Sequence, residues 1–459
     1  MKMKIFYSVL CLMAIIYVKE TFLTDFTTEQ QLTLCLLAFA VYLWVAAPIP
    51  TGPTSILLLA CMLIFNLVDS VEDALVGFLS PALYFILLLS LISYSLVQVG
   101  VDKIIARFLI KMSKGGPTLI VIMLPLFILV LPIILPSAIA RFKMLLPIIT
   151  KLNQYYGFPE KSLFEKYSLY VIGMLNQKAT MIIFTGGGFP ILASQLLKDY
   201  EIAEVGWMDW FLHIGPPLWI GSIIVAIFVW QFLKKMSPND EWYNERKPID
   251  FVDQKEDRMP PAFWVVIISF LLMIMTWIVT DQGKVPLVLP PMILVVLYSL
   301  PKLGLITNKV IRDYDWENFL LLGSSFSLGM LMAENGTASV LARELISFVS
   351  PDEGMTVKII AISLLIFLLR FLFVVPSSAM IVIFPIVISY SELIGVQPEK
   401  LAFLVIMIIG GVVVLPIHSP TVYMAYETGI FKKKEQYIIG VSSSIIIMII
   451  AILASLYYW

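Results

Sequence analysis

Residues 355–392 read MTVKIIAISLLIFLLRFLFVVPSSAMIVIFPIVISYSE, an almost uninterrupted apolar stretch with a proline-bearing break, Val375-Pro376-Ser377-Ser378, near its middle. About 20 apolar residues let a helix cross the hydrocarbon core of a bilayer, so this stretch is too long for one crossing. Residues 117–150 repeat the design, with Leu135-Pro136-Ser137-Ala138 as the break. Because proline ends or kinks helices, each stretch should form two shorter helices that meet at its break.

Two short helices that meet inside a membrane form a re-entrant hairpin. Backbone that is exposed at that depth is tolerated only where protein buries it or where it lines a wet cavity. The alternative is a pair of ordinary helices joined by a loop in water. The breaks are only a few residues long and nearly uncharged, which favours hairpins at 117–150 and 355–392.

Composition excludes a soluble globular protein. Residues of the AVILMFWYC set make up 60% of the 459 positions, 14% are charged, and the mean hydropathy is +0.94. Soluble domains are nearer half apolar and a quarter charged. The net charge of −1 gives no reason to expect nucleic acid as a partner. Cys11, Cys35 and Cys61 lie in apolar segments without metal or disulfide spacing, so we interpret them as packing residues.

These observations predict an all-α polytopic membrane protein with about 11 transmembrane helices plus two re-entrant hairpins. We expect the helices at residues 5–24, 30–48, 52–68, 78–100, 163–197, 210–234, 261–281, 285–300, 317–336, 399–426 and 436–458. Basic residues near helix ends set orientation through the positive-inside rule. If each of the two long apolar stretches returns to the side of the membrane from which it entered, the basic residues near helix ends all fall on one side of the membrane. This places the N-terminus in the cytoplasm and Trp459 outside a cytoplasmic membrane.

The chain also repeats itself. An N-terminal helix (1–29) precedes a first unit (30–234), and a cytoplasmic linker (235–260) separates it from a second unit (261–459). Each unit has a hairpin followed by a broken helix: hairpin 117–150 and broken helix 163–197, then hairpin 355–392 and broken helix 399–426. The interruptions are Thr185-Gly186-Gly187-Gly188-Phe189-Pro190 and Leu415-Pro416-Ile417-His418-Ser419-Pro420-Thr421. An odd number of crossings per unit makes the two repeats inverted, which predicts a transport site at their interface.

With these elements in place, the sequence resembles the divalent-anion:sodium symporter family. The resemblance runs through nearly the whole chain and rests on five segments in order. They are LCLLAFAVYLWVAAPIPTGPTSILLL (34–59), LPSAIARFKMLLPI (135–148), DWENFLLLGSSFSLGMLMAENGTASVLA (315–342), VPSSAMIVIFPI (375–386) and LPIHSPTVYMAYETGIF (415–431). The resemblance implies transport of dicarboxylates, citrate or sulfate, sodium as the coupling ion and no other cofactor. It also implies a homodimer and an elevator-like motion of the hairpin and broken-helix domain.

The chain departs from the family pattern at the hairpin tips. The family has Ser-Asn-Thr there, and its asparagine and threonine side chains hold the substrate carboxylates. Here the tips read Pro136-Ser137-Ala138 and Pro376-Ser377-Ser378, without asparagine. Pro190 is followed by Ile191 and Pro420 by Thr421, where the family has asparagine. Losing these amides removes donors aimed at an anion, so both the dicarboxylate preference and sodium coupling are open.

Helix ends and small polar residues at the breaks are the candidate substrate site, because unpaired N–H groups there bind anions. The substrate candidates are Ser137, Ala138, Arg141, Thr185, Gly187, Pro190, Ser377, Ser378, Ser419, Pro420 and Thr421. Candidates for a cation site, or for its replacement, are Lys178, Gly186, Gly188 and His418. The glycine run permits close backbone approach and positive φ; the alternative is tight helix packing.

Basic residues inside apolar stretches are costly at mid-bilayer, roughly 2.5 kcal/mol or more each, which favours a function for them. We favour Arg141 or Lys178 as the positive charge that the missing asparagine and sodium sites do not provide. The alternative for Lys143 and Arg370 is snorkelling or a structural ion pair. His418 could couple protons, but a lone histidine is more often structural.

The sequence thus predicts a secondary transporter of small anions, with di- or tricarboxylates ahead of sulfate or another oxyanion. A sodium-independent exchanger or a proton-coupled anion carrier is the alternative. From other classes, a non-transporting membrane scaffold or a membrane-embedded enzyme also stays open. We expect no enzyme, because we find no intramembrane cluster of His, Asp or Glu suited to catalysis. The expected partners are a small anionic substrate, the lipid bilayer and a second copy of the chain.

Overall fold

The computed structural model describes residues 26–46, 49–236, 260–280, 285–338, 340, 353–371, 373, 376–415 and 418–459. Every regular element in this part of the chain is a helix, which confirms the all-α prediction. The expected helix at 5–24 lies outside the described residues. So does nearly all of the linker 235–260, except for its first two residues and Pro260.

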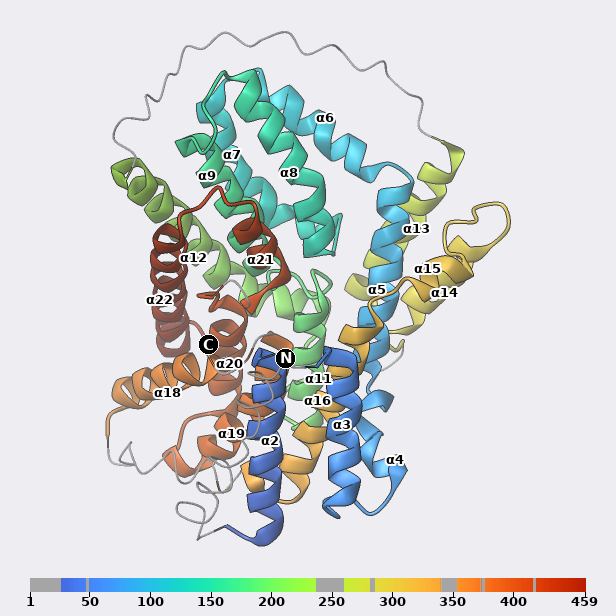
Figure 1. Cartoon of the computed structure of the whole chain (residues 1–459), viewed down its shortest axis with the longest axis vertical. Coiled ribbons are helices and arrows are strands. Elements are labelled where there is room, and N and C mark those ends of the chain that lie inside the picture. The colour runs from blue at the N-terminus through green and yellow to red at the C-terminus, as the bar shows by residue number, and fades with distance from the viewer. Residues whose placement is uncertain are drawn as a thin grey trace.

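The elements of the first half follow one another closely (Figure 1). They are α2 (Thr28–Ala46), α3 (Thr51–Ile64), α4 (Val71–Ala74), the 3-10 helix η1 (Val76–Leu79), α5 (Pro81–Gln98), α6 (Val101–Ser113), α7 (Pro117–Val130), the 3-10 helix η2 (Leu131–Ile133), α8 (Ala138–Tyr155), α9 (Leu163–Tyr170), the π-helix η3 (Val171–Leu175), α10 (Asn176–Ala179), α11 (Gly188–Asp199) and α12 (Trp207–Met236).

The second half begins after the linker. Its elements are α13 (Pro261–Val279), α14 (Leu289–Ser299), α15 (Asn308–Arg312), α16 (Trp316–Glu334), α18 (Met355–Arg370), α19 (Pro376–Ile394), α20 (Pro398–Gly411), α21 (Pro420–Glu427) and α22 (Lys433–Tyr457).

Four helices in the described part are long and apolar enough to cross a membrane without interruption: α5, α12, α13 and α22. Shorter apolar helices include α3, α14 and the segment Pro117–Ile133. Proline and glycine breaks shorten the remaining apolar segments, so the total of 11 crossings stays a prediction. The structure adds α6, which is not among the helices predicted from the sequence. Its apolar residues Val101, Ile105 and Leu109 recur every fourth position and are buried, while Lys103 and Lys111 are exposed.

The interruptions in the four predicted segments differ in detail from expectation. In 117–150, the chain leaves regular helix after Ile133, and Ser137 caps α8. In 355–392, α19 already begins at Pro376, so Ser377 and Ser378 belong to its first turn and not to the break. The first broken helix loses regular structure from Thr180 to Gly187, which is earlier than predicted, and Gly188 and Pro190 lie in the first turn of α11. Likewise α20 ends at Gly411, and Pro420 and Thr421 start α21.

The two broken helices run in opposite directions along the molecule. In Figure 1, α9 lies in the upper part and α11 in the lower, whereas α20 lies below α21. Both helices of the first long stretch, α7 and α8, are in the upper part, and α18 and α19 are in the lower part. Inverted repeats require this arrangement, although the repeat boundaries and the hairpins stay predictions.

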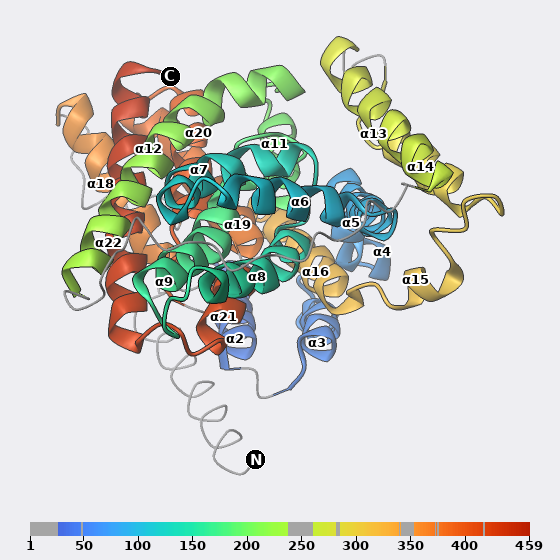
Figure 2. The same cartoon turned by 90° about the horizontal axis from the view of Figure 1, so that it is seen from above.

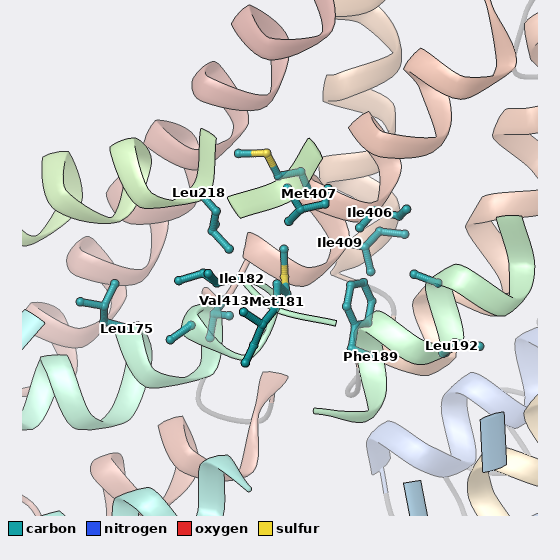
Figure 3. Close-up of a cluster of buried hydrophobic side chains, with 14 of the residues drawn as sticks. Leu175, Met181, Ile182, Phe189, Leu192, Leu218, Ile406, Met407, Ile409 and Val413 are labelled. Carbon is teal, nitrogen blue, oxygen red and sulfur yellow. The ribbon is translucent and has the colours of Figure 1, made fainter. Parts of the chain in front are cut away.

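One part of the extended core lies where the two broken helices pack against each other and against α12. Figure 3 shows one cluster there, in which Leu175, Met181 and Phe189 of the first broken helix lie near Leu218 of α12 and Ile409 of α20. Helices α13 and α14 project from the side of this bundle (Figure 2). One third of the most apolar window of α13 is buried, as suits a helix that faces lipid.

Candidate functional site

Arg141 ties the break of the first long apolar stretch to the first broken helix. Its side chain is fully buried in the first turn of α8. Nη1 donates to the carbonyl oxygens of Leu135 (2.5 Å) and Pro136 (3.0 Å). Nε and Nη2 donate to Asn176 of α10, at its Oδ1 (2.6 Å) and its carbonyl oxygen (3.3 Å). Asn176 in turn donates to the carbonyl of Ala138 (2.9 Å), so the guanidinium joins the two elements.

Arg370 does the same in the second half of the chain. It is fully buried at the end of α18, where the second long stretch breaks. Nη1 donates to the carbonyl of Phe373 (2.5 Å), in the break, and Nε to that of Ile409 (3.1 Å), in α20. Nη2 donates to the carbonyl of His418 (3.4 Å), inside the second interruption. The ion pair considered for Arg370 is absent among the described residues, and backbone oxygens take its place.

The two broken helices touch at their interruptions. Ser419 Oγ donates to Gln177 Oε1 (2.8 Å), and Thr421 Oγ1 donates to the carbonyl of Gly173 (2.9 Å). The π-helix that contains Gly173 leaves backbone oxygens off the regular helical ladder, and one of them accepts from Thr421. The predicted residues Ser419 and Thr421 are therefore brought together with the first broken helix, at Gln177 and Gly173.

His418 is fully buried at this junction, and its ring packs edge-on against Phe371. Nδ1 accepts from the backbone N–H groups of Val414 (3.3 Å) and Leu415 (3.5 Å), so the ring proton is on Nε2. Within the described part of the chain, Nε2 has no hydrogen-bond partner. The contacts assign His418 a structural part in holding the second break, and proton coupling through it stays untested.

Lys178 is fully buried in α10, and Nζ donates to Ser443 Oγ of α22 (3.2 Å). An ammonium has three hydrogens to donate, so one hydroxyl satisfies it incompletely. Lys143, two residues beyond Arg141, is instead exposed. This position fits the snorkelling alternative.

The glycine run of the first broken helix serves close packing. A Cβ on Gly186 would lie 2.4 Å from the carbonyl oxygen of Thr180, and one on Gly188 would lie 2.7 Å from Ile86 of α5. Neither has a positive φ, and Gly187 is extended at φ 175°. The run therefore does not use the positive φ that glycine permits, and its close contacts fit the packing alternative. The cation-site role of Gly186 and Gly188 stays a prediction. Thr185 accepts from the Trp207 indole (3.3 Å) and is nearly buried.

A cleft of about 790 Å³ lies between α5 and α8 and reaches the break of the first long apolar stretch at Ser137. We call it the α5–α8 cleft; Ser93 and Tyr94 line one wall, and Ser137, Ala140 and Lys143 line the other. Ser137 Oγ accepts from the N–H of Ala140 (3.2 Å). Ser93 Oγ is buried without a partner among the described residues. Ser93 is not among the site residues predicted from the sequence. No local sequence pattern distinguishes it from a serine that only packs inside an apolar helix.

The buried charges near the breaks are mostly positive. Among the described residues, no carboxylate forms an ion pair with Arg141, Lys178 or Arg370. The buried pair Lys166–Glu435, with Nζ 2.8 Å from Oε1, is the compensated exception and joins α9 to α22. This ion pair was not predicted from the sequence, because its members are 269 positions apart. In the sequence, Asn176 and Gln177 are distinguished only as polar residues within an apolar segment.

Comparison with known proteins places the chain in a family. Residues 2–459 match the model of the sodium:sulfate symporter transmembrane region. The chain belongs to the sodium:sulfate symporter family. The chain is 23% identical to an uncharacterized transporter of Haemophilus influenzae, over 95% of this chain and 93% of that protein. It is also 23% identical to an uncharacterized transporter of Methanocaldococcus jannaschii, over 56% and 57% of the two chains. A membrane protein of Cupriavidus necator is 19% identical, over 94% and 88%.

Membership of the sodium:sulfate symporter family confirms the resemblance seen in the sequence. The family is one of membrane transporters, so the chain is a membrane transporter. The predicted site residues lie at or next to the helix breaks of this transporter.

Proposed function

We propose that this transporter is a secondary carrier of small anions, with di- and tricarboxylates ahead of sulfate or another oxyanion. The observation that carries this proposal is the group of buried basic residues, Arg141, Arg370 and Lys178, without a carboxylate partner in the described chain. Charge acts over longer distances in a low-dielectric interior than in water. An interior with this excess attracts anions and repels cations.

The anion enters through the α5–α8 cleft and reaches the first turn of α8. Residues Ala138 and Ile139 present N–H groups that have no helical acceptor, and the helix dipole adds positive potential there. Ser137 donates its hydroxyl hydrogen, and Arg141 lies one turn behind it. The symmetric contribution of the second break comes from Ser377 and Ser378 at the start of α19.

The carrier works as a homodimer by alternating access of the elevator type, in the cytoplasmic membrane. Support for this comes from the sequence resemblance and from the opposite directions of the two broken helices. The hairpins and broken helices form the moving domain, and helices such as α13 and α14 belong to the scaffold. A protein of this kind is neither an enzyme nor a passive scaffold.

Uptake into proteoliposomes tests the proposal. The purified chain should take up at least one of labelled succinate, citrate and sulfate, measured with and without a sodium gradient and with matched preloading of the vesicles. Protein-free vesicles and vesicles with Ser137→Pro, which removes the hydroxyl and distorts the start of α8, are the controls. Uptake equal to that of protein-free vesicles for every anion would favour the scaffold alternative.

A further inference from the structure

Helix α6 crosses one end of the bundle and does not run through it. It has 13 residues and is therefore about 20 Å long, whereas a helix needs about 20 residues to span a bilayer. Gly100 before the helix and Gly116 after it have positive φ, at 101° and 90°, so the chain turns sharply at both ends. In Figure 1, α5 runs along the long axis of the molecule, while α6 slants across its upper end. Figure 2, seen from above, shows α6 from its side.

Three rows of side chains run along α6. Val101, Ile105 and Leu109 form the buried row, on the side where α6 packs against α5, α7 and α8. Ile104 and Phe108 form the α6 apolar row and are 41% and 49% exposed. The α6 basic row consists of Lys103, Arg107, Lys111 and, at the helix end, Lys114. Because successive helical residues are about 100° apart, the α6 apolar row lies between the buried row and the basic row.

Contacts within the chain do not account for the two outer rows. In the part of the chain that the structure describes, no ion pair includes a member of the α6 basic row. The helix dipole favours Lys111 in the last turn but disfavours Lys103 in the first. The one acidic residue of α6, Asp102, lines the α5–α8 cleft and has a buried oxygen. Water solvates the basic row well, but it does not favour the exposed apolar row beside it.

We infer that α6 lies in the headgroup region of the cytoplasmic leaflet and binds anionic lipid there. A helix at a membrane surface places its apolar side chains at the boundary with the acyl chains and its basic side chains at the phosphates. The two outer rows of α6 have this order. Phe108 stacks on Phe127 of α7, with ring centroids 5.3 Å apart, which fixes the rotation of α6 and hence the rows that meet the lipid.

The charge of the outer face selects the occupant. The positive-inside rule assigns the end that carries α6 to the cytoplasm, and the cytoplasmic leaflet attracts basic segments through its anionic lipids. A second copy of the chain is a poor occupant, because a twofold interface brings the same face of both copies together and the two basic rows repel each other. The inference is independent of the solute that the transporter carries.

Native mass spectrometry of the full chain in detergent tests the binding. The probes are phosphatidylglycerol and phosphatidylcholine with identical chains, at equal concentrations. Phosphatidylglycerol should bind about fivefold or more tightly, since each basic residue near an anionic surface contributes about that factor. The variant Lys103→Gln/Arg107→Gln/Lys111→Gln/Lys114→Gln keeps polar side chains at the outer face and should bind the two lipids within about twofold of each other. Equal binding of both lipids to the unaltered chain would overturn the inference.

A matched variant separates this row from a general effect of charge. Lys302→Gln/Arg312→Gln/Lys433→Gln/Lys434→Gln removes four exposed charges that the positive-inside rule assigns to the same side, and it should keep the lipid preference. An equal loss in this control would contradict a site on α6. Millimolar inorganic phosphate, compared with chloride at equal ionic strength, should not displace the lipid, because phosphate has no chain for the α6 apolar row. Displacement by phosphate would assign the row to a free anion and overturn the lipid assignment.

The depth of α6 is measured in vesicles of phosphatidylcholine and phosphatidylglycerol. In a background without the native cysteines, a fluorescent label is attached to Ile104→Cys or to Lys111→Cys. Spin-labelled lipid should quench the label at 104 more strongly, and iodide in the water should quench the label at 111 more strongly. Quenching of both labels by iodide and of neither by lipid would place α6 in water and contradict the inference, whatever the mass spectra show.

Discussion

Single residues in this protein are constrained most tightly where the backbone is irregular. Gly186 lies in the interruption of the first broken helix, where any side chain would meet the carbonyl oxygen of Thr180. The main chain cannot yield as a flexible side chain can, so the absence of a Cβ is a packing requirement. Arg141 and Arg370 show the complementary constraint: irregular backbone leaves carbonyls that need donors, and a long charged side chain supplies several at once.

Gly186→Ala should lower stability because its Cβ would lie 2.4 Å from Thr180 O. Overpacking of this kind costs about 1–3 kcal/mol, seen as a lower melting temperature in detergent. Gly354→Ala is the control, since a Cβ there meets nothing within 4 Å. Equal melting temperatures for the two variants would show that the interruption adapts to a methyl group.

At the scale of elements, the broken helices are held by polar contacts between distant segments. Lys166 of α9 pairs with Glu435 at the start of α22, and both side chains are more than nine-tenths buried. The other Glu435 oxygen accepts from the backbone N–H of Lys432 (2.9 Å), which fixes the carboxylate at the helix start. Neutralising one member leaves the other buried without its partner, so this pair locks α9 and α22 together.

Lys166→Met should destabilise the protein by about 3–5 kcal/mol, because it strands the Glu435 carboxylate. The double variant Lys166→Met/Glu435→Gln should recover most of that loss. Lys198→Met is the matched control: its pair with Glu204 (3.1 Å) is 59% and 66% exposed, and such pairs contribute less than about 1 kcal/mol. Unfolding followed in detergent would measure all three. A double variant as unstable as the single one would argue against the ion pair as the cause.

At the scale of the whole molecule, the α5–α8 cleft separates α5 from the proposed first hairpin. If the hairpin domain moves, the width of this cleft has to change during transport. The cleft is also lined by Lys309 and by the carboxylates of Asp102, Asp313 and Asp315, so both charge signs are present there.

A bridge across the cleft should stop transport. In a background in which Cys11, Cys35 and Cys61 are replaced by serine, Ser93→Cys and Ala140→Cys would be joined by a cleavable bis-maleimide. Uptake should fall in the double variant and return when the linker is cleaved, while each single variant treated alike keeps more of its uptake. Full transport by the bridged protein would contradict movement at this cleft.

Orientation can be measured in the same cysteine-free background. Lys114 follows α6 and Glu204 lies between α11 and α12, and both are exposed. The positive-inside rule predicts that an impermeant maleimide labels Glu204→Cys in intact cells but labels Lys114→Cys only after permeabilisation. The reverse pattern would invert the proposed topology.

The sequence by itself determined the helical class, the apolar segments and the neighbourhood of each break, because hydropathy and proline act locally. Leu135-Pro136-Ser137-Ala138 and the glycine run at 186–188 lie within a few residues of the observed interruptions. The sequence also showed that Arg141 and Arg370 lie inside apolar stretches, where a buried charge requires polar partners. Only the tertiary structure decided that backbone carbonyl oxygens, and not a carboxylate, are the partners of these two arginines. Only the tertiary structure also decided that Lys166 forms an ion pair with Glu435. Such contacts depend on how segments far apart in the chain are packed in space, and no local pattern encodes that packing.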